Sequence, residues 1–129
     1  MQEQRIVTIT IPGALPTMNE IIDAAKTEPY VYSKYKKRYT ELVHWCAKGK
    51  GRFERVDVVI TWYCRNRKKD KDNIMAGQKF IFDGLQAAGV IANDGWKQIG
   101  DVVHRFETDK ANPRVVVELT EVTDGSGAA

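Results

Sequence analysis

Cysteine is scarce in this chain, and its spacing excludes the structures that cysteine usually builds. Among 129 residues only Cys46 and Cys64 are cysteines, and they form no CxxC pair. We therefore expect neither a disulfide framework nor a zinc motif, and a reducing compartment fits best. The chain also lacks a run of the roughly 20 apolar residues that cross a bilayer, and its start lacks the apolar core of a signal peptide. These absences predict a cytoplasmic protein without a membrane partner.

Other features that carry chemistry are missing too. The only histidines, His44 and His104, have no partner at metal-ligand spacing, so we assign them no chemistry. No Gly-rich phosphate loop occurs, which argues against a phosphohydrolase that acts on a small substrate. The length suits one domain with a modest core. We predict a single domain over residues 1–123, followed by a disordered tail over residues 124–129.

Charge of one sign is not in large excess, because 20 basic residues face 17 acidic ones and the net charge is only +3. Such a balance does not by itself indicate a nucleic-acid partner. The distribution is more informative, since basic residues gather in three clusters that suggest a basic surface stripe. The clusters are Lys34, Lys36, Lys37 and Arg38; Lys48, Lys50 and Arg52; and Arg65, Arg67, Lys68 and Lys69.

The sequence does contain clear strand patterns. Residues 6–11 are β-branched, and from Val7 onward they alternate apolar with polar side chains, which predicts a half-buried strand. Residues 56–64 are apolar on both faces, as is typical of an interior strand. Two further strands are predicted near residues 99–106 and 115–119, with a turn at Asn112-Pro113 between them.

Helical spacing of apolar residues predicts helices over residues 18–26, 34–48 and 73–88. Asp72 or Asn73 is the predicted cap of the last helix, and Gly77 is a weak point inside it. Together with the strands, this order predicts a two-layer α+β domain with a mixed sheet of about four strands and helices on one face.

Three aspartates stand out against this framework. Asp70 and Asp72 follow the third basic cluster, and Asp94 follows the last predicted helix. In an extended segment alternate side chains share a face, so Asp70 and Asp72 are predicted to point the same way. Carboxylates beside cations are typical of a magnesium site that acts on a polyanion. An Asp-x-Asp pair alone is more often a solvated turn or a helix cap.

Further motifs lie in order around these aspartates. They are Arg67-Lys68-Lys69-Asp70-Lys71-Asp72-Asn73, Phe82-Asp83-Gly84-Leu85 and Ala88-Gly89-Val90-Ile91-Ala92-Asn93-Asp94, preceded by a proline-containing loop that ends at Asn19. Over about residues 6–121 this pattern resembles the RusA family of Holliday junction resolvases, of a phage or prophage type. The resemblance implies a small homodimeric endonuclease that cuts four-way DNA junctions symmetrically with a divalent metal.

The resemblance also implies roles for individual residues. Its three catalytic aspartates match Asp70, Asp72 and Asp94, which would bind Mg²⁺ with Mn²⁺ as a substitute. Its catalytic lysine matches Lys79, four residues before Asp83. We expect the DNA backbone to be bound, without sequence reading, by Arg65, Arg67, Lys68 and Lys69. Asn19 either contacts DNA or braces its own loop, and Asn73 and Asp83 are candidate supports of the metal ligands.

This chain departs from the family pattern at two places. About three residues are inserted before Lys79, and they preserve its helical direction because three residues rotate a helix by about 300°. Asn93 stands where the family often has an aspartate. The return of Asp94 to Asp70 is also tight, because residues 73–88 would form a helix about 24 Å long and residues 89–94 extend at most about 20 Å.

That tight span leaves two arrangements. Either the helix starts late, near Gly77, or Asp94 completes the site of a partner subunit, and we favour the first. A non-catalytic DNA-binding domain of the same fold is the main alternative function. Lys79 has a plainer alternative as well, an ion pair with Asp83 on a wet helix face. We predict core or dimer contacts for the tryptophans Trp45, Trp62 and Trp96, although Trp96 is also the best candidate for stacking on a base.

Overall fold

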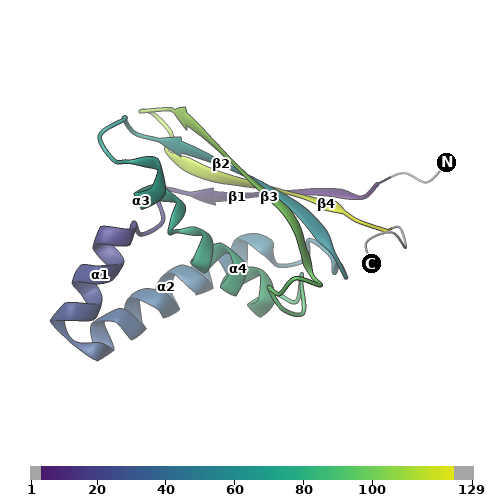
Figure 1. Ribbon diagram of the computed structural model, residues 1–129, viewed down its shortest axis with the longest axis horizontal. Helices are drawn as coiled ribbons and strands as arrows, with labels where there is room; N and C mark the ends of the chain where they lie inside the picture. Colours follow the sequence, from purple (N-terminus) through teal and green to yellow (C-terminus); the bar gives the residue numbers. More distant parts are fainter. Residues whose placement is uncertain (1–3, 124–129) are drawn as a thin grey trace.

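The computed structural model describes residues 4–123, in which four strands form one mixed sheet. The strands are β1 (Ile6–Pro12), β2 (Val56–Cys64), β3 (Ile99–Thr108) and β4 (Arg114–Glu121). They lie in the order β1-β4-β2-β3, with β2 parallel to β3 and antiparallel to β4 (Figure 1). The prediction of a mixed sheet of about four strands with an interior strand at residues 56–64 is confirmed.

Four helices lie on one side of this sheet, which confirms the two-layer α+β class (Figure 1). They are α1 (Met18–Thr27), α2 (Pro29–Ala47), α3 (Lys71–Met75) and α4 (Gln78–Ala87). The helix predicted over residues 34–48 begins earlier than expected, at Pro29. A proline in the first helical turn is favourable, because its missing N–H would have no helical partner there.

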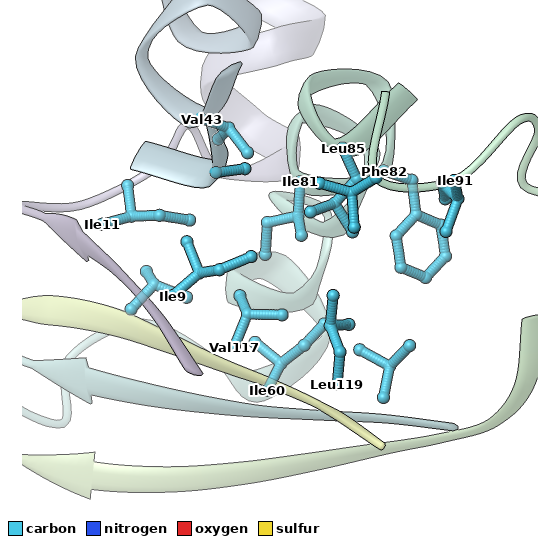
Figure 2. Close-up of a cluster of buried hydrophobic side chains, with 14 of the residues drawn as sticks. Ile9, Ile11, Val43, Ile60, Ile81, Phe82, Leu85, Ile91, Val117 and Leu119 are labelled. Atoms are coloured by element: carbon cyan, nitrogen blue, oxygen red, sulfur yellow. The ribbon is translucent and has the colours of Figure 1, made fainter. Parts of the chain in front are cut away.

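The core lies between the sheet and helices α2 and α4 (Figure 2). In β1 only every second residue is buried, and its inward side chains Ile9 and Ile11 are fully buried. They pack with Ile81 and Leu85 of α4 in the same cluster. Gly84 lets α4 approach α2 closely, because a Cβ atom at this position would collide with Val43. This packing fixes the direction of α4 along the sheet.

The single helix predicted over residues 73–88 is wrong. Helix α3 ends at Met75 and α4 begins at Gln78, so the helix is interrupted at Ala76 and Gly77. A Cβ atom on Gly77 would lie 2.9 Å from the Leu15 Cβ and 3.0 Å from the Trp62 ring. Only glycine allows so close a contact with both side chains. Because Trp62 lies near the carboxyl end of β2, the interruption between α3 and α4 packs against that end of the strand.

A partly buried polar contact joins the same break to the sheet. The Trp62 Nε1–H donates to His104 Nδ1 over 2.9 Å, which leaves the proton of a neutral ring on Nε2, 2.8 Å from the Gln78 Oε1. Burial lowers the pKa of His104, which favours this neutral form. Strands β2 and β3 are thereby connected to the first residue of α4.

Two sequence predictions concern the ends of the chain and membranes. The tail predicted over residues 124–129 lies outside the described residues. Within residues 4–123 no helix is both long and apolar enough to cross a membrane.

Candidate functional site

The carboxyl end of β2 carries two adjacent cavities. The first, the Asp70 cavity, has a volume of about 450 Å³, and its wall includes Asp70 with Arg67, Lys69 and Lys71. The second, the Trp62 cavity, has a volume of about 670 Å³ and extends to the loop after β1. The two cavities share a wall made by Cys64, Asn66, Lys69 and Ile74. The predicted basic segment thus lines two neighbouring hollows at one end of the sheet.

Asp70 and Asp72 do not share a face in the way the sequence suggested. Asp70 is the N-cap of α3 and has extended backbone angles, but the helix begins at Lys71. The predicted caps Asp72 and Asn73 therefore lie inside the helix, where the alternation of an extended segment does not apply. Both carboxylates are exposed, but only that of Asp70 lines the Asp70 cavity.

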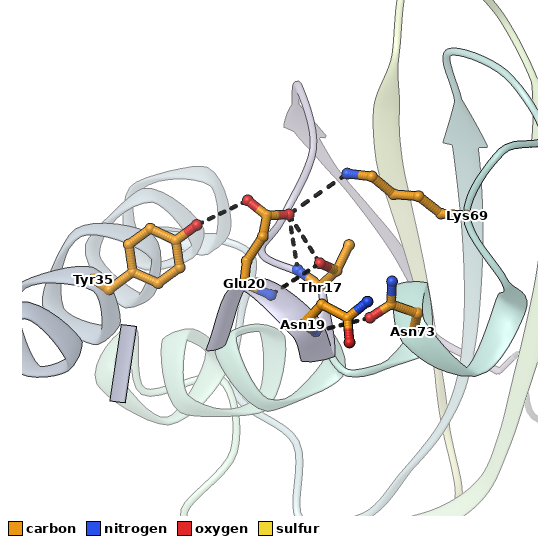
Figure 3. Close-up of polar contacts among 6 residues, drawn as sticks. All are labelled: Thr17, Asn19, Glu20, Tyr35, Lys69 and Asn73. Carbon is orange, nitrogen blue, oxygen red and sulfur yellow. Dashed lines mark hydrogen bonds and ion pairs between the residues drawn. The ribbon is translucent and has the colours of Figure 1, made fainter. Parts of the chain in front are cut away.

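The start of α1 is bonded to the segment that carries these aspartates (Figure 3). The backbone N–H of Asn19 donates to the Asn73 Oδ1 over 2.9 Å. One residue later, the Glu20 carboxylate forms an ion pair with the Lys69 Nζ at 3.5 Å. Two contacts, one on each side of Asp70 in the sequence, therefore position its loop. The backbone of Asn19 thus helps to hold the loop that carries Asp70. The DNA contact predicted for Asn19 would have to involve its side chain.

Glu20 was not among the predicted site residues. Its carboxylate also accepts hydrogen bonds from the hydroxyl groups of Thr17 and Tyr35, each 3.0 Å long. Burial acts to raise the pKa of Glu20, but the hydrogen bonds from Thr17 and Tyr35 and the charge of Lys69 outweigh it and lower that pKa. Burial and the bond to Glu20 raise the pKa of Tyr35 to about 12. Near neutral pH the carboxylate therefore stays charged and Tyr35 stays a donor.

Lys79 and Asp83 both belong to α4, beyond the break at Gly77. Lys79 is exposed, and none of the ion pairs within residues 4–123 joins it to Asp83. Asp83 instead has a buried Oδ2 without a hydrogen-bond partner among the described residues. The break also means that Asp72 and Lys79 are not on one regular helix. The predicted helical direction of Lys79, which assumed one helix over residues 73–88, therefore does not apply.

Asp94 lies at the other end of β2. Its loop is bonded to the start of that strand, because the Val56 N–H donates to the Gln98 carbonyl over 2.9 Å and the Phe53 N–H to the Val90 carbonyl over 2.8 Å. Strand β2 has nine residues, which corresponds to about 26 Å between its ends. Although α4 starts as late as Gln78, it runs away from Asp70 (Figure 1). The favoured return of Asp94 to Asp70 within one chain is therefore wrong.

The donor atoms for a divalent cation are consequently of the right chemistry but are not brought together within residues 4–123. Between residues 4 and 123 no three His, Cys, Asp or Glu side chains are grouped closely enough to bind a metal. Asp70, Asp72 and Asp94 are all exposed, and none of them takes part in an ion pair with another described residue. Exposed carboxylates suit Mg²⁺, which needs oxygen ligands and keeps several waters.

The basic clusters do not form one continuous stripe. The cluster at residues 65–69 follows the carboxyl end of β2, whereas the one at residues 48–52 precedes its amino end. Arg65, Arg67, Lys68 and Lys69 are all exposed, as the predicted DNA contacts require.

The three tryptophans differ sharply in environment. Trp62 is 3 % exposed and belongs to the core, as predicted. Trp45 on α2 is 64 % exposed and Trp96 in the Asp94 loop is 97 % exposed, so neither belongs to the core. The prediction of a dimer contact remains for these two.

Comparison with known proteins adds no assignment to this site. No model of a known protein family matches the chain, and no curated protein matches it either. The interpretation therefore rests on the motifs and on the geometry.

Proposed function

We propose that this chain is a Mg²⁺-dependent endonuclease for branched DNA that cleaves four-way junctions as a homodimer. The observation that carries the proposal is the Asp70 cavity, where an exposed carboxylate lies among Arg67, Lys69 and Lys71 at the end of β2. Metal-dependent cleavage of DNA uses both features together, cations for the DNA backbone and carboxylates for the metal. The resemblance to RusA-type motifs names the same residues.

Each group has a distinct task in this proposal. Exposed Arg67 and Lys68 attract the phosphate backbone, so binding should weaken steeply as salt rises. Asp70 and Asp72 supply oxygen ligands, and bound Mg²⁺ would neutralise phosphate charge and make a coordinated water more acidic. Lys79 is proposed to stabilise negative charge that develops at the phosphate. Glu20 and Asn73 position the Asp70 loop through the contacts at Lys69 and Asn19.

The third carboxylate is proposed to come from the partner subunit. Asp94 lies at the amino end of β2, whereas Asp70 and Asp72 follow its carboxyl end. In a two-fold dimer the same patch of each subunit is used twice, so opposite ends of two β2 strands can meet at two equivalent places. Such a dimer has two complete sites, as paired cleavage of two strands requires.

Cleavage of a labelled four-way junction in Mg²⁺, in Mn²⁺ and in EDTA tests the activity. Asp70→Asn is expected to reduce the rate by about two orders of magnitude or more. Asp101→Asn is the matched control, because Asp101 is an exposed aspartate on β3 that lies away from both cavities. Full activity of Asp70→Asn, or an intact junction with wild-type protein, would refute the proposal. Salt-sensitive binding without cleavage would favour the non-catalytic DNA-binding domain.

A mixing experiment tests whether the site is shared. Asp70→Asn and Asp94→Asn are each expected to be inactive as homodimers. In a mixed dimer with shared sites, both substitutions fall in one site and the other site is wild type. Activity on one strand should therefore return when the two variants are mixed and allowed to exchange subunits. If each site is built within one chain, no mixture regains activity.

A further inference from the structure

Trp96 presents its side chain to solvent on a loop that is itself well fixed. The indole is 97 % exposed. The Arg55 guanidinium donates to the backbone carbonyls of Trp96 at 2.8 Å and Lys97 at 3.1 Å. Large aromatic side chains lose favourable burial when they are left in water, and they are frequent anchors of protein interfaces. A fixed backbone with a protruding indole is therefore suited to insertion into a partner.

The Trp62 cavity, at the opposite end of β2, has the properties of a receptor for such a side chain. Its volume of about 670 Å³ exceeds that of an indole, and its wall includes the apolar side chains of Leu15, Trp62 and Ile74. Four cations complete the wall, and none of the described residues that line the cavity is Asp or Glu. The cations are Arg65, Lys69, Lys110 and Arg114.

We propose that Trp96 of each protomer inserts into the Trp62 cavity of a second copy of this chain. This inference rests on the shared site of the proposed function, in which Asp94 lies beside Asp70 of the partner. Asp94 and Trp96 are two residues apart and are thus separated by at most about 7 Å along the backbone. The Asp70 cavity and the Trp62 cavity share a wall that includes Lys69 and Ile74. An Asp94 at the first cavity therefore brings Trp96 to the second.

Charge complementarity favours a second copy as the occupant. The loop that carries Trp96 also carries the exposed carboxylate of Asp94 as well as the exposed Lys97, whereas the Trp62 cavity is lined by cations without an acid among its described residues. Arg65 and Lys110 in that wall have no ion pair within residues 4–123. Arginine and lysine also interact favourably with the face of an indole ring. Asp94 at the Asp70 cavity and Trp96 in the Trp62 cavity would thus each lie beside cations of the partner, including Lys69 in the shared wall.

Sedimentation equilibrium without DNA or metal tests the contact. Trp96→Ala is expected to raise the dimer dissociation constant at least about tenfold, as loss of an interface anchor does. Tyr30→Ala is the matched control, because it removes another exposed aromatic side chain, from α2, for which no dimer contact is predicted, and it should leave the constant unchanged. On the receptor side, Ala111→Trp places a bulky ring at an exposed position of the cavity wall and should weaken the dimer similarly. If Trp96→Ala and Ala111→Trp both dimerise with the same dissociation constant as wild type, the inference is wrong.

Fluorescence gives a second readout that leaves Trp96 and the Trp62 cavity unaltered. In Trp45→Phe the remaining emission comes from buried Trp62 and from Trp96. Its maximum should shift to shorter wavelength as protein concentration rises through the dimer range, and absence of a shift contradicts insertion. If Trp96→Ala dimerises normally but loses junction binding, the indole contacts DNA and the inference is wrong. Cleavage by Asp70→Asn is measured separately, so the proposed function can fail while the dimer contact stands, or the reverse.

Discussion

The two ends of β2 hold their loops in different ways. At the carboxyl end the chain is fixed by packing, with Gly77 in contact with Leu15 and Trp62. At the amino end the Asp94 loop is fixed by hydrogen bonds, chiefly those from Arg55 to backbone carbonyls. Two cavities lie at the packed end, whereas the hydrogen-bonded end exposes Trp96. One end thus has the shape of a receptor and the other the shape of an insert.

The difference predicts different responses to substitution. A packed contact has no free volume, so an added methyl group must displace its neighbours. A hydrogen-bonded loop loses its order when the donor is removed, but the core beneath it stays intact. The following variants compare the two ends directly, in order of decreasing effect on the free energy of unfolding.

Gly77→Ala should have the largest effect. The new Cβ would lie 2.9 Å from the Leu15 Cβ and 3.0 Å from the Trp62 ring, and we expect overpacking to cost about 1–3 kcal/mol in denaturant unfolding. Gly95→Ala is the control at the other end, where the nearest atom is the Gln98 Oε1 at the ordinary distance of 3.4 Å. Equal stability of the two variants would contradict the distinction between the ends.

Arg55→Ala should have a smaller effect on stability, about 1–1.5 kcal/mol, because the two hydrogen bonds from its guanidinium lie at the surface. Amide hydrogen exchange should accelerate in residues 92–98 and remain unchanged in β2. Arg52→Ala removes the same charge from an exposed side chain that makes no ion pair among the described residues. Accelerated exchange across β2 as well would show that this end also depends on packing.

The smallest effect should come from pH acting on His104. Burial lowers its pKa in the folded chain, so below about pH 6.5 the unfolded state takes up a proton that the folded state does not. The free energy of unfolding should therefore fall as pH decreases from 7 to 5.5. His104→Asn should reduce this slope, and denaturant titrations at each pH measure it. An unchanged slope in the variant would assign the effect to other groups.

Local patterns were sufficient to predict the sheet. The alternation of residues 6–11 and the apolar run of residues 56–64 each report burial within a few positions, and the observed β1 and β2 follow them closely. The structure also contains a capping box at the start of α1, formed by Thr17 and Glu20, whose Thr-x-x-Glu spacing is typical of that motif although it was not among the predictions. The reach of Glu20 to Tyr35 and Lys69 was not predictable, because it depends on how α1 lies against two distant segments.

The candidate site was harder to predict because its geometry depends on contacts that are distant in sequence. The break at Gly77 depends on Leu15 and Trp62, and the helical turn after Asp70 removes the alternation expected of an extended chain. The close packing of Gly84 against Val43 helps to set the direction of α4 and hence the position of Asp94. None of these contacts is visible from spacing within the motif itself.

The parallel pairing of β2 with β3 has a consequence for every residue between them. Two parallel strands begin at the same edge of a sheet, so the connecting chain must travel back the full length of the first strand before the second starts. Asp70 lies at the start of this connection, just after β2, and Asp94 lies near its end, just before β3. Their separation is thus a property of topology and would survive any shortening or lengthening of the helices between them. In the proposed dimer, a second molecule that runs in the opposite direction would bring the two carboxylates together.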